Sequence, residues 1–380
     1  MNPPPFSHAS DNTPSGTLMS ATTSPSLPAT MRGVYLPGDS TASVRSVAVP
    51  EPGPGQVLLR IGAAGICGSD IGYIYREHKT HRGVEGPAYR GVIASHEPSG
   101  TVVAAGPGVR AFGVGDRVVV YHIAGCGRCD ACRRGYFINC TSPERAAYGW
   151  QRDGAAADYL VADESTLIAL PDELSFVDGA LIACGFGTAY EGIRRINVSG
   201  DDDLLVVGLG PVGLAAGMIG RGRGARRVIG VELSEERRAW ADGLGVFDAT
   251  VAPGEAGPVV AELTGGRGTS TAIDCSGSRP GRSTAIEHIA EWGRLSLVGE
   301  GGTLETEVSD PLLHKQVTIY ASWVTSLPAM SELARSLVRW GMRPESVVSD
   351  RFALSDADTA FRLAAGAGRG KVVLVPDLDG

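Results

Sequence analysis

No stretch of the 380-residue sequence approaches the roughly 20 consecutive apolar residues that a helix needs to cross a bilayer. The N-terminus also lacks a basic segment followed by an apolar core, so we expect no secretory signal. An excess of positive charge is missing as well, since the formal net charge is −8. Nucleic acids and anionic membranes select basic surfaces, so we expect neither kind of partner. What remains is a globular chain without visible repeats, long enough for two domains.

Cysteine is also scarce, and its distribution is uneven. Of the seven cysteines, four lie between positions 126 and 140. Such clustering is typical of metal ligands in a reducing compartment rather than of a disulfide framework. We therefore expect a cytoplasmic protein.

Glycine, by contrast, is abundant, with 53 residues, and three glycines form a motif after a short apolar run. Positions 204–207 have the continuous apolar character of a parallel strand, and positions 212–219 have the composition of a helix. Between them, Gly208, Gly210 and Gly213 spell G-x-G-x-x-G. In this motif one glycine permits the tight turn, one lets the backbone approach a pyrophosphate, and one allows the helix to pack on the strand. The pattern predicts a dinucleotide site at the helix N-terminus; the alternative is an ordinary glycine loop.

An acidic residue at the end of the next strand supports the dinucleotide interpretation. Positions 227–231 form a second apolar strand that ends on Glu232. A carboxylate there accepts hydrogen bonds from ribose hydroxyls and repels a 2′-phosphate, so NAD is favoured over NADP. Arg237 and Arg238 follow on a helix that Ser234 is expected to cap. Either arginine would soften the preference if it reached the phosphate, and we expect at least one to point away.

The four clustered cysteines form a C-x2-C-x2-C-x7-C pattern. They are Cys126, Cys129, Cys132 and Cys140. Four thiolates on one polar loop predict a closed tetrahedral zinc site with a structural role. An iron–sulfur cluster or a nucleic-acid-binding zinc ribbon is the alternative, and the acidic charge balance weakens the second.

Three further residues have the ligand types of a catalytic zinc site. Cys67 lies in Gly-Ile-Cys-Gly-Ser-Asp at 65–70, His96 in Ser-His-Glu-Pro-Ser-Gly at 95–100, and Cys184 in Cys-Gly-Phe-Gly-Thr at 184–188. Two cysteines and one histidine leave a fourth position open for substrate. Glu97, beside the histidine, can also approach the metal. Cys67 taken alone is more simply explained as a buried structural cysteine.

In this order, the motifs around Cys67, His96, the four-cysteine lobe, Cys184 and the glycine turn resemble those of the zinc-containing medium-chain dehydrogenase/reductase superfamily, over roughly residues 31–376. The resemblance implies an α/β protein in which a GroES-like catalytic β-domain is combined with a doubly wound Rossmann domain. It implies an active site between the two domains, two zinc ions per chain, NAD as cofactor, and a homodimer or homotetramer. Within the superfamily the chain is more similar to polyol and threonine dehydrogenases than to zinc-free quinone reductases.

Carried over residue by residue, the resemblance gives roles to single positions. Cys67, His96 and Cys184 fall on the catalytic zinc ligands, with Glu97 as the neighbouring acid, and the four lobe cysteines fall on the structural site. Asp70 falls on the acid that orients the histidine ligand. For the cofactor we expect contacts from Gly208, Gly210, Pro211, Val212, Gly213, Glu232, Arg237, Thr188, Cys275 and Gly299.

Two positions depart from the family pattern. The histidine that many members carry shortly after the first zinc ligand is replaced, with Gly72 and Tyr73 in its neighbourhood. A proton relay through it is therefore in doubt, and Ser69 becomes the best remaining hydroxyl. The glycine usual before the His-Glu pair is Ser95, which either tightens that turn or forms a local hydrogen bond.

The substrate is expected to be polar. His122 lies four positions before the cysteine lobe, in a segment that contributes to the family's substrate cleft. The loop between the first two zinc ligands carries His78, Lys79, His81 and Arg82, for which a solvated loop is at least as good an explanation. We expect oxidation of a secondary alcohol of a polyol, sugar, cyclitol or aminocyclitol, with hydride transfer to NAD. A threonine-type β-hydroxy amino acid and a non-catalytic zinc- and NAD(H)-binding protein are the alternatives.

The expected domain organisation follows the same order along the chain. Residues 1–30 are rich in Pro, Ser and Thr without an apolar period, so we expect a disordered tail. Residues 31–184 and 325–380 are expected to form the catalytic domain, with the zinc lobe at 126–140, and residues 185–324 the Rossmann domain. Among its elements we expect a strand at 101–105 in the first and a helix at 282–291 in the second.

Overall fold

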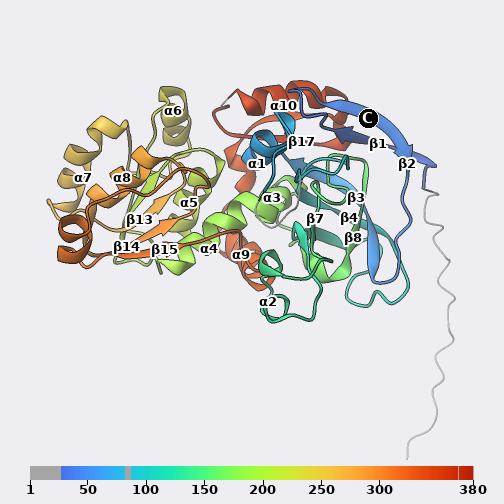
Figure 1. Ribbon diagram of the computed structural model, residues 1–380, viewed down its shortest axis with the longest axis horizontal. Coiled ribbons are helices and arrows are strands. Elements are labelled where there is room, and N and C mark those ends of the chain that lie inside the picture. The colour runs from blue at the N-terminus through green and yellow to red at the C-terminus, as the bar shows by residue number, and fades with distance from the viewer. Residues whose placement is uncertain (1–26, 82–86, 367, 380) are drawn as a thin grey trace, which may run out of the picture.

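A computed structural model describes residues 27–81, 87–366 and 368–379. Figure 1 shows two lobes side by side, each built on its own sheet, with helices α4 (Gly187–Arg195) and α9 (Leu327–Trp340) where the lobes meet. The expectation of a disordered tail concerns positions that lie almost entirely outside the described residues. Strand β1 already begins at Thr30. None of the helices in the described ranges is long and apolar enough to cross a membrane.

The Rossmann domain contains a six-stranded parallel sheet in the order β12-β11-β10-β13-β14-β15. This is the doubly wound order, so the predicted fold class is confirmed. The elements are β10 (Asp203–Val207), α5 (Pro211–Gly222), β11 (Arg227–Val231), α6 (Glu235–Gly243), β12 (Ala249–Val251), α7 (Ala256–Thr264), β13 (Thr269–Asp274), α8 (Arg279–Glu287), β14 (Ile289–Leu297) and β15 (Thr318–Ala321). All five residues of β10 are buried, as a central parallel strand requires.

The catalytic domain contains a mostly antiparallel sheet in the order β16-β17-β3-β4-β5-β9, with β8 also paired to β3. Two small sheets, β1-β2 and β6-β7, accompany it. The strands of the domain are β1 (Thr30–Tyr35), β2 (Ser43–Ala48), β3 (Gln56–Gly65), β4 (Glu97–Ala105), β5 (Arg117–Val120), β6 (Ile123–Ala124), β7 (Ala146–Ala147), β8 (Tyr159–Asp163), β9 (Leu167–Ala169), β16 (Val348–Phe352) and β17 (Lys371–Leu374). Its helical segments include α1 (Gly68–Asp70), η1 (Ile71–Tyr75), α2 (Asp130–Arg133), η2 (Phe137–Asn139), α3 (Phe176–Leu181), η4 (Ile182–Phe186) and α10 (Ala357–Ala365).

The C-terminal segment of the described chain returns to the N-terminal part in this domain. Strand β17 pairs antiparallel with β3, and helix α10 lies beside β2, so the C-terminal red ribbon lies next to the N-terminal blue one in Figure 1. The catalytic sheet is therefore completed only by residues from both ends of the described sequence.

Two predicted elements have different limits in the structure. Strand β4 begins at Glu97 and not at 101, and it contains Pro98. There β4 is paired with β3 only, since pairing with β5 starts at Ser99, so the missing N–H of proline leaves no gap in a central ladder. The helix predicted at 282–291 runs from Arg279 to Glu287, because Ser278 caps its N-terminus and strand β14 begins at Ile289. Strands β2 and β16 were not predicted.

Candidate active site

The pairing of β3 with β4 brings the first two candidate zinc ligands together. Gly65 lies opposite Glu97, so Cys67, just past the end of β3, faces His96, just before β4. Cys184 reaches the same point from η4. The Sγ atoms of Cys67 and Cys184 are 4.0 Å apart, and ligand atoms of these three residues and Glu97 all lie within 4.8 Å of one another.

Asp70 fixes the orientation of the histidine, in the role that the resemblance suggested. Its Oδ1 lies 2.8 Å from His96 Nδ1, and its Oδ2 accepts the backbone N–H of Cys67 at 2.9 Å. Burial alone would lower the pKa of His96, but the Asp70 carboxylate raises that pKa well above its ordinary value. Because Nδ1 is bonded to the carboxylate, Nε2 is the nitrogen left for a metal.

The Glu97 carboxylate is buried, and only one of its two oxygens has a hydrogen-bond partner in the described part of the chain. Its Oε1 accepts a hydrogen bond of 2.6 Å from Lys371 Nζ, whereas its Oε2 is buried without a partner among the described residues. Burial raises the pKa of Glu97 to about 7, against the lowering effect of Lys371. An orphaned carboxylate oxygen beside two thiols and an imidazole is the environment that a divalent cation satisfies.

The donor atoms also fit zinc in spacing. Two thiolates at about 2.3 Å from a tetrahedral zinc lie about 3.8 Å from each other, close to the separation of Cys67 and Cys184. As free thiols the two already favour one negative charge, since a hydrogen bond from Cys184 lowers the pKa of Cys67 well below its ordinary value. The same contact raises the pKa of Cys184. The residues present therefore fit a catalytic zinc ion.

Ser95 takes over the place of a glycine. Its φ of 69° lies in the left-handed region, and its Oγ donates to the carbonyl of Gly65 at 2.8 Å. The sequence left open whether Ser95 tightens the turn or forms a local hydrogen bond. In the structure it does both. This hydrogen bond ties the start of β4 to the end of β3.

The four-cysteine lobe forms a second group of donors. Ligand atoms of Cys126, Cys129, Cys132 and Cys140 lie within 4.8 Å of one another. The lobe rests on the helices at the domain junction: Gly135 O accepts the N–H of Leu327, at the start of α9, at 2.9 Å, and Tyr136 donates to Glu191 on α4 at 2.9 Å. All seven cysteines of the chain are described, and all are free thiols. The arrangement suits a closed structural zinc site.

The glycine turn has the geometry that a pyrophosphate needs. Gly208 has φ 88°, and a Cβ on Gly213 would lie 1.8 Å from the carbonyl oxygen of Gly208. Helix α5 begins at Pro211, which fits the first helical position because it lacks an N–H. Val212 follows and reaches the pocket described below. The free N–H groups of this helix start are available to phosphate oxygens.

Glu232 is buried and anchors the cofactor crevice. Its carboxylate accepts the N–H of Leu209 at 2.8 Å and that of Ser234 at 2.9 Å. Arg238 is turned away and donates to the carbonyls of residues 232 and 233. Arg237 faces the turn, with a guanidinium nitrogen 4.0 Å from where a Cβ on Gly210 would lie, and it donates to Gly368 O at 3.2 Å. One arginine is thus placed next to the glycine turn, and it bridges the two domains.

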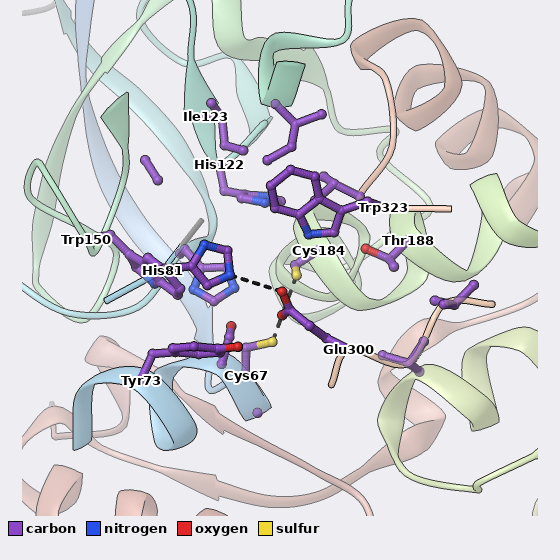
Figure 2. A pocket seen from close by; sticks show the side chains of 18 of the residues that line it. Cys67, Tyr73, His81, His122, Ile123, Trp150, Cys184, Thr188, Glu300 and Trp323 are labelled. Carbon is purple, nitrogen blue, oxygen red and sulfur yellow. Dashed lines mark hydrogen bonds and ion pairs between the residues drawn. The ribbon is translucent and has the colours of Figure 1, made fainter. Parts of the chain in front are cut away.

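A cavity of about 380 Å³ lies between the candidate metal ligands and the glycine turn (Figure 2). It brings together Cys67, His96 and Cys184 with the predicted residues Ser69, His122, Thr188, Val212, Cys275 and Gly299. Burial raises the pKa of the Cys275 thiol well above its ordinary value. The candidate metal ligands and several of the residues expected to contact substrate and cofactor therefore line one space.

His122 presents an acceptor to this cavity. Burial, with a smaller effect of His96, lowers its pKa to about 3, so the ring is neutral at neutral pH. Its Nδ1 lies 2.9 Å from the carbonyl oxygen of Ala183, which only accepts, so Nδ1 carries the proton. The Nε2 lone pair is left to accept a hydrogen bond, for example from a substrate hydroxyl.

Several residues of the cavity were missed in the sequence. They are Tyr73, Arg145, Trp150, Gln151, Glu300 and Trp323. Glu300 had a visible indication, because it follows a parallel strand at the end where ligands bind in doubly wound sheets. Of the four polar loop residues, His81 reaches the cavity, while Arg82 lies outside the described residues.

Comparison with known proteins agrees with this geometry. Residues 53–172 match the family Alcohol dehydrogenase GroES-like domain, and residues 211–339 match the family Zinc-binding dehydrogenase. An uncharacterized zinc-type alcohol dehydrogenase-like protein of Escherichia coli is 52% identical over 91% of this chain and 98% of its own length. A sorbitol dehydrogenase of Halalkalibacterium halodurans is 29% identical over 89% of this chain and 97% of its own.

Two further matches bear on substrate and cofactor. An L-threonine 3-dehydrogenase of Pyrococcus horikoshii is 30% identical over 88% of this chain and 95% of its own. The crystal structure of a dehydrogenase from Sinorhizobium meliloti, described as zinc-binding and bound to NADP, superimposes with a TM-score of 0.80 at 27% identity. It covers 92% of this chain and 100% of its own.

Fold, donor sets and relatives define an NAD(P)-dependent zinc alcohol dehydrogenase, an enzyme that interconverts an alcohol and the corresponding carbonyl compound. The chain belongs to the zinc-containing medium-chain dehydrogenase/reductase family. This assignment leaves the non-catalytic alternative without support.

Proposed function

We propose that the protein oxidises a secondary alcohol of a polyhydroxylated substrate, such as a polyol, sugar, cyclitol or aminocyclitol, to a ketone and transfers hydride to NAD. The observation that carries the proposal is a set of polar groups among the apolar walls of the cavity. Besides the candidate ligands, its lining includes these side chains that exchange hydrogen bonds: Ser69, His81, His122, Arg145, Gln151 and Glu300. A cavity for a simple aliphatic alcohol needs few such groups.

Each residue then has a part in the reaction. A zinc ion held by Cys67, His96 and Cys184 would act as a Lewis acid and lower the pKa of the substrate hydroxyl. Ser69 lines the cavity beside Cys67 and is proposed to accept the proton that leaves this hydroxyl. His122 Nε2 accepts from a neighbouring hydroxyl and so orients the carbon skeleton. The glycine turn, Thr188 and Gly299 would hold the cofactor, which would supply the hydride acceptor.

Threonine is the second candidate, and Arg145 is the observation that favours it. A guanidinium in the cavity suits a substrate carboxylate. Against this, Arg145 Nε donates to the carbonyl of Ile138 at 3.1 Å, and the Glu300 carboxylate in the same cavity repels a second carboxylate. A polyhydroxylated neutral substrate avoids this conflict.

The test is a substrate screen with the purified, zinc-loaded enzyme. Hexitols, cyclitols, aminocyclitols, threonine and 2-butanol are offered with NAD, and NADH formation is followed by absorbance. The proposal expects the highest kcat/KM for a polyol or cyclitol. Highest activity with threonine, or with 2-butanol, would contradict it.

We also propose a homodimer or homotetramer in the cytoplasm. Strand β15 is the open edge of the Rossmann sheet, and large apolar side chains are exposed next to it: Trp292, Val308 and Leu313. Open sheet edges and exposed apolar patches are places where chains associate. Light scattering on the purified protein gives the mass, and a monomer would contradict the proposal.

A further inference from the structure

His81 sits among three aromatic rings at the cavity (Figure 2). Its ring centroid lies 4.8 Å from that of Tyr73, 5.0 Å from that of Trp150 and 6.0 Å from that of Trp323. Tyr73 and Trp150 belong to the catalytic domain, and Trp323 follows the last Rossmann strand. The His81 side chain is only 11% exposed, so its place is set by packing and not by solvent.

Glu300 meets this histidine from the other domain. His81 Nε2 and Glu300 Oε1 are 3.1 Å apart, although the two residues are 219 positions apart in sequence. The Glu300 side chain is 47% exposed, and both residues line the cavity. The pair therefore joins the two domains across the space where a substrate binds.

The backbone on either side of Glu300 is held in place by Arg282. Its guanidinium donates to the carbonyls of Gly299 at 2.8 Å and Gly301 at 2.7 Å. Arg282 is in turn paired with the fully buried Asp274, at 3.1 Å. A carboxylate on a backbone fixed at both flanking residues is preorganised for binding, so Glu300 is more than a residue of a free surface loop.

We propose that Glu300 and His81 determine specificity by binding a hydroxyl group remote from the reacting carbon, an inference that rests on the polyol function proposed above. A carboxylate has two oxygens, so Glu300 can keep its contact with His81 and still accept a substrate O–H. Hydrogen bonds to a charged acceptor are about twice as strong as neutral ones. The rings of Trp150 and Trp323 add apolar walls for the carbon skeleton.

This subsite selects for length and hydroxyl content. An alcohol with a single hydroxyl engages the candidate zinc site alone and gains nothing from the pair. A substrate that carries a carboxylate at this place meets the Glu300 charge. A substrate amine would also bind the Glu300 carboxylate, but its binding depends on the negative charge. A substrate hydroxyl needs only a hydrogen-bond acceptor.

The test compares Glu300→Ala, Glu300→Gln and His81→Gln with the wild type, using a hexitol and 2-butanol. The readout is the ratio of kcat/KM for the hexitol to that for 2-butanol. We expect Glu300→Ala to lower this ratio about tenfold to 100-fold, the usual effect of losing a hydrogen bond to a charged group. We expect Glu300→Gln and His81→Gln to lower it less, since an acceptor remains. Glu305→Gln removes an equivalent charge from an exposed ion pair five positions away and serves as the matched control.

Binding without turnover separates this inference from the proposed function. The hexitol is titrated into the enzyme–NADH complex, and the fluorescence of the cavity tryptophans reports its Kd. A weaker Kd in Glu300→Ala, with the Kd of NADH retained, supports the subsite. Equal losses for both alcohols would reduce the pair to a contact between domains and overturn the proposal. So would a preference for amino sugar alcohols that Glu300→Gln abolishes. Lack of turnover of every alcohol by the wild type would instead overturn the proposed function.

Discussion

The Asp70 carboxylate holds the His96 ring from Nδ1 at 2.8 Å and, with its second oxygen, holds the backbone of Cys67 at 2.9 Å. One side chain thus positions two of the three candidate ligands. The buried Glu97 oxygen without a partner lies beside them, which gives the group both its geometry and its need for a cation.

Replacing Cys184 with Ala is expected to abolish turnover and to lower the zinc content from two ions per chain to one. Two ligands, His96 and Cys67, hold zinc poorly, while the lobe and the cofactor crevice do not involve Cys184. Elemental analysis and activity assays on the folded variant check this. Cys275→Ala removes another thiol from the same cavity and should keep both zinc ions. Near-normal activity in Cys184→Ala would remove it from the ligand set.

Replacing Cys129 with Ala is expected to lower the stability rather than the chemistry. The lobe rests on α4 and α9, so its loss of order exposes the helices at the domain junction. A loss of about 4 kcal/mol, within the range expected when a metal site is removed, lowers Tm by roughly 5 °C in a chain of this size. Differential scanning calorimetry measures it. An unchanged Tm and oligomeric state would contradict a structural zinc.

We expect Glu232 and Arg237 to have opposite effects on the choice between NAD and NADP. Two like charges about 4 Å apart at an effective dielectric near 20 repel by about 4 kcal/mol, so the carboxylate disfavours a 2′-phosphate and the wild type should prefer NAD. Arg237, which faces the glycine turn, is expected to reduce this preference for NAD over NADP. Glu232→Ala should narrow the gap mainly by weakening NAD, and Arg237→Ala should widen it by weakening NADP.

The measurement is kcat/KM with each cofactor. Glu232→Gln is the matched variant, because it keeps an acceptor for the Leu209 or Ser234 N–H while removing the charge. A wild type that prefers NADP, or a Glu232→Ala variant with an unaltered ratio, would show that another group selects the cofactor.

Arg282→Met is expected to destabilise the Rossmann domain and to raise KM for NAD. It leaves the Asp274 carboxylate buried without its cation, which costs about 3–5 kcal/mol, and it releases the backbone around Glu300. Arg279→Met, on the same helix, breaks only an exposed pair with Glu305 and should change stability by less than about 1 kcal/mol. Urea unfolding distinguishes the two. Equal effects would mean that burial of the pair is unimportant.

Local chemistry explains which parts could be predicted from sequence. Gly208 and Gly213 occupy positions where a Cβ is strained or has no room, so the residue type itself records the turn. The strand that follows the turn and its terminal acid obey similarly local rules. The two families that match the chain confirm the fold class that these motifs predicted.

Contacts between distant segments account for what was missed. The helix period continued past His288, but pairing of β14 with β13 ends the helix there, a tertiary effect that no local pattern contains. The same is true of the contact between His81, which looked like an ordinary polar loop residue, and Glu300, which was indicated only by its place after a strand end. Their meeting depends on how two domains pack, and the sequence between them carries no record of it.

The return of the C-terminal segment to the sheet of the catalytic domain has a consequence for the order of folding. Lys371, which partners Glu97, and strand β17, which pairs with β3, follow the whole Rossmann sheet in the sequence. The Rossmann sheet is continuous in sequence and can fold earlier, whereas the catalytic sheet has to close a loop of some 270 residues first. During refolding the dinucleotide crevice is therefore expected to form before the candidate zinc site, because Glu97 gains its Lys371 partner only when β17 has paired with β3.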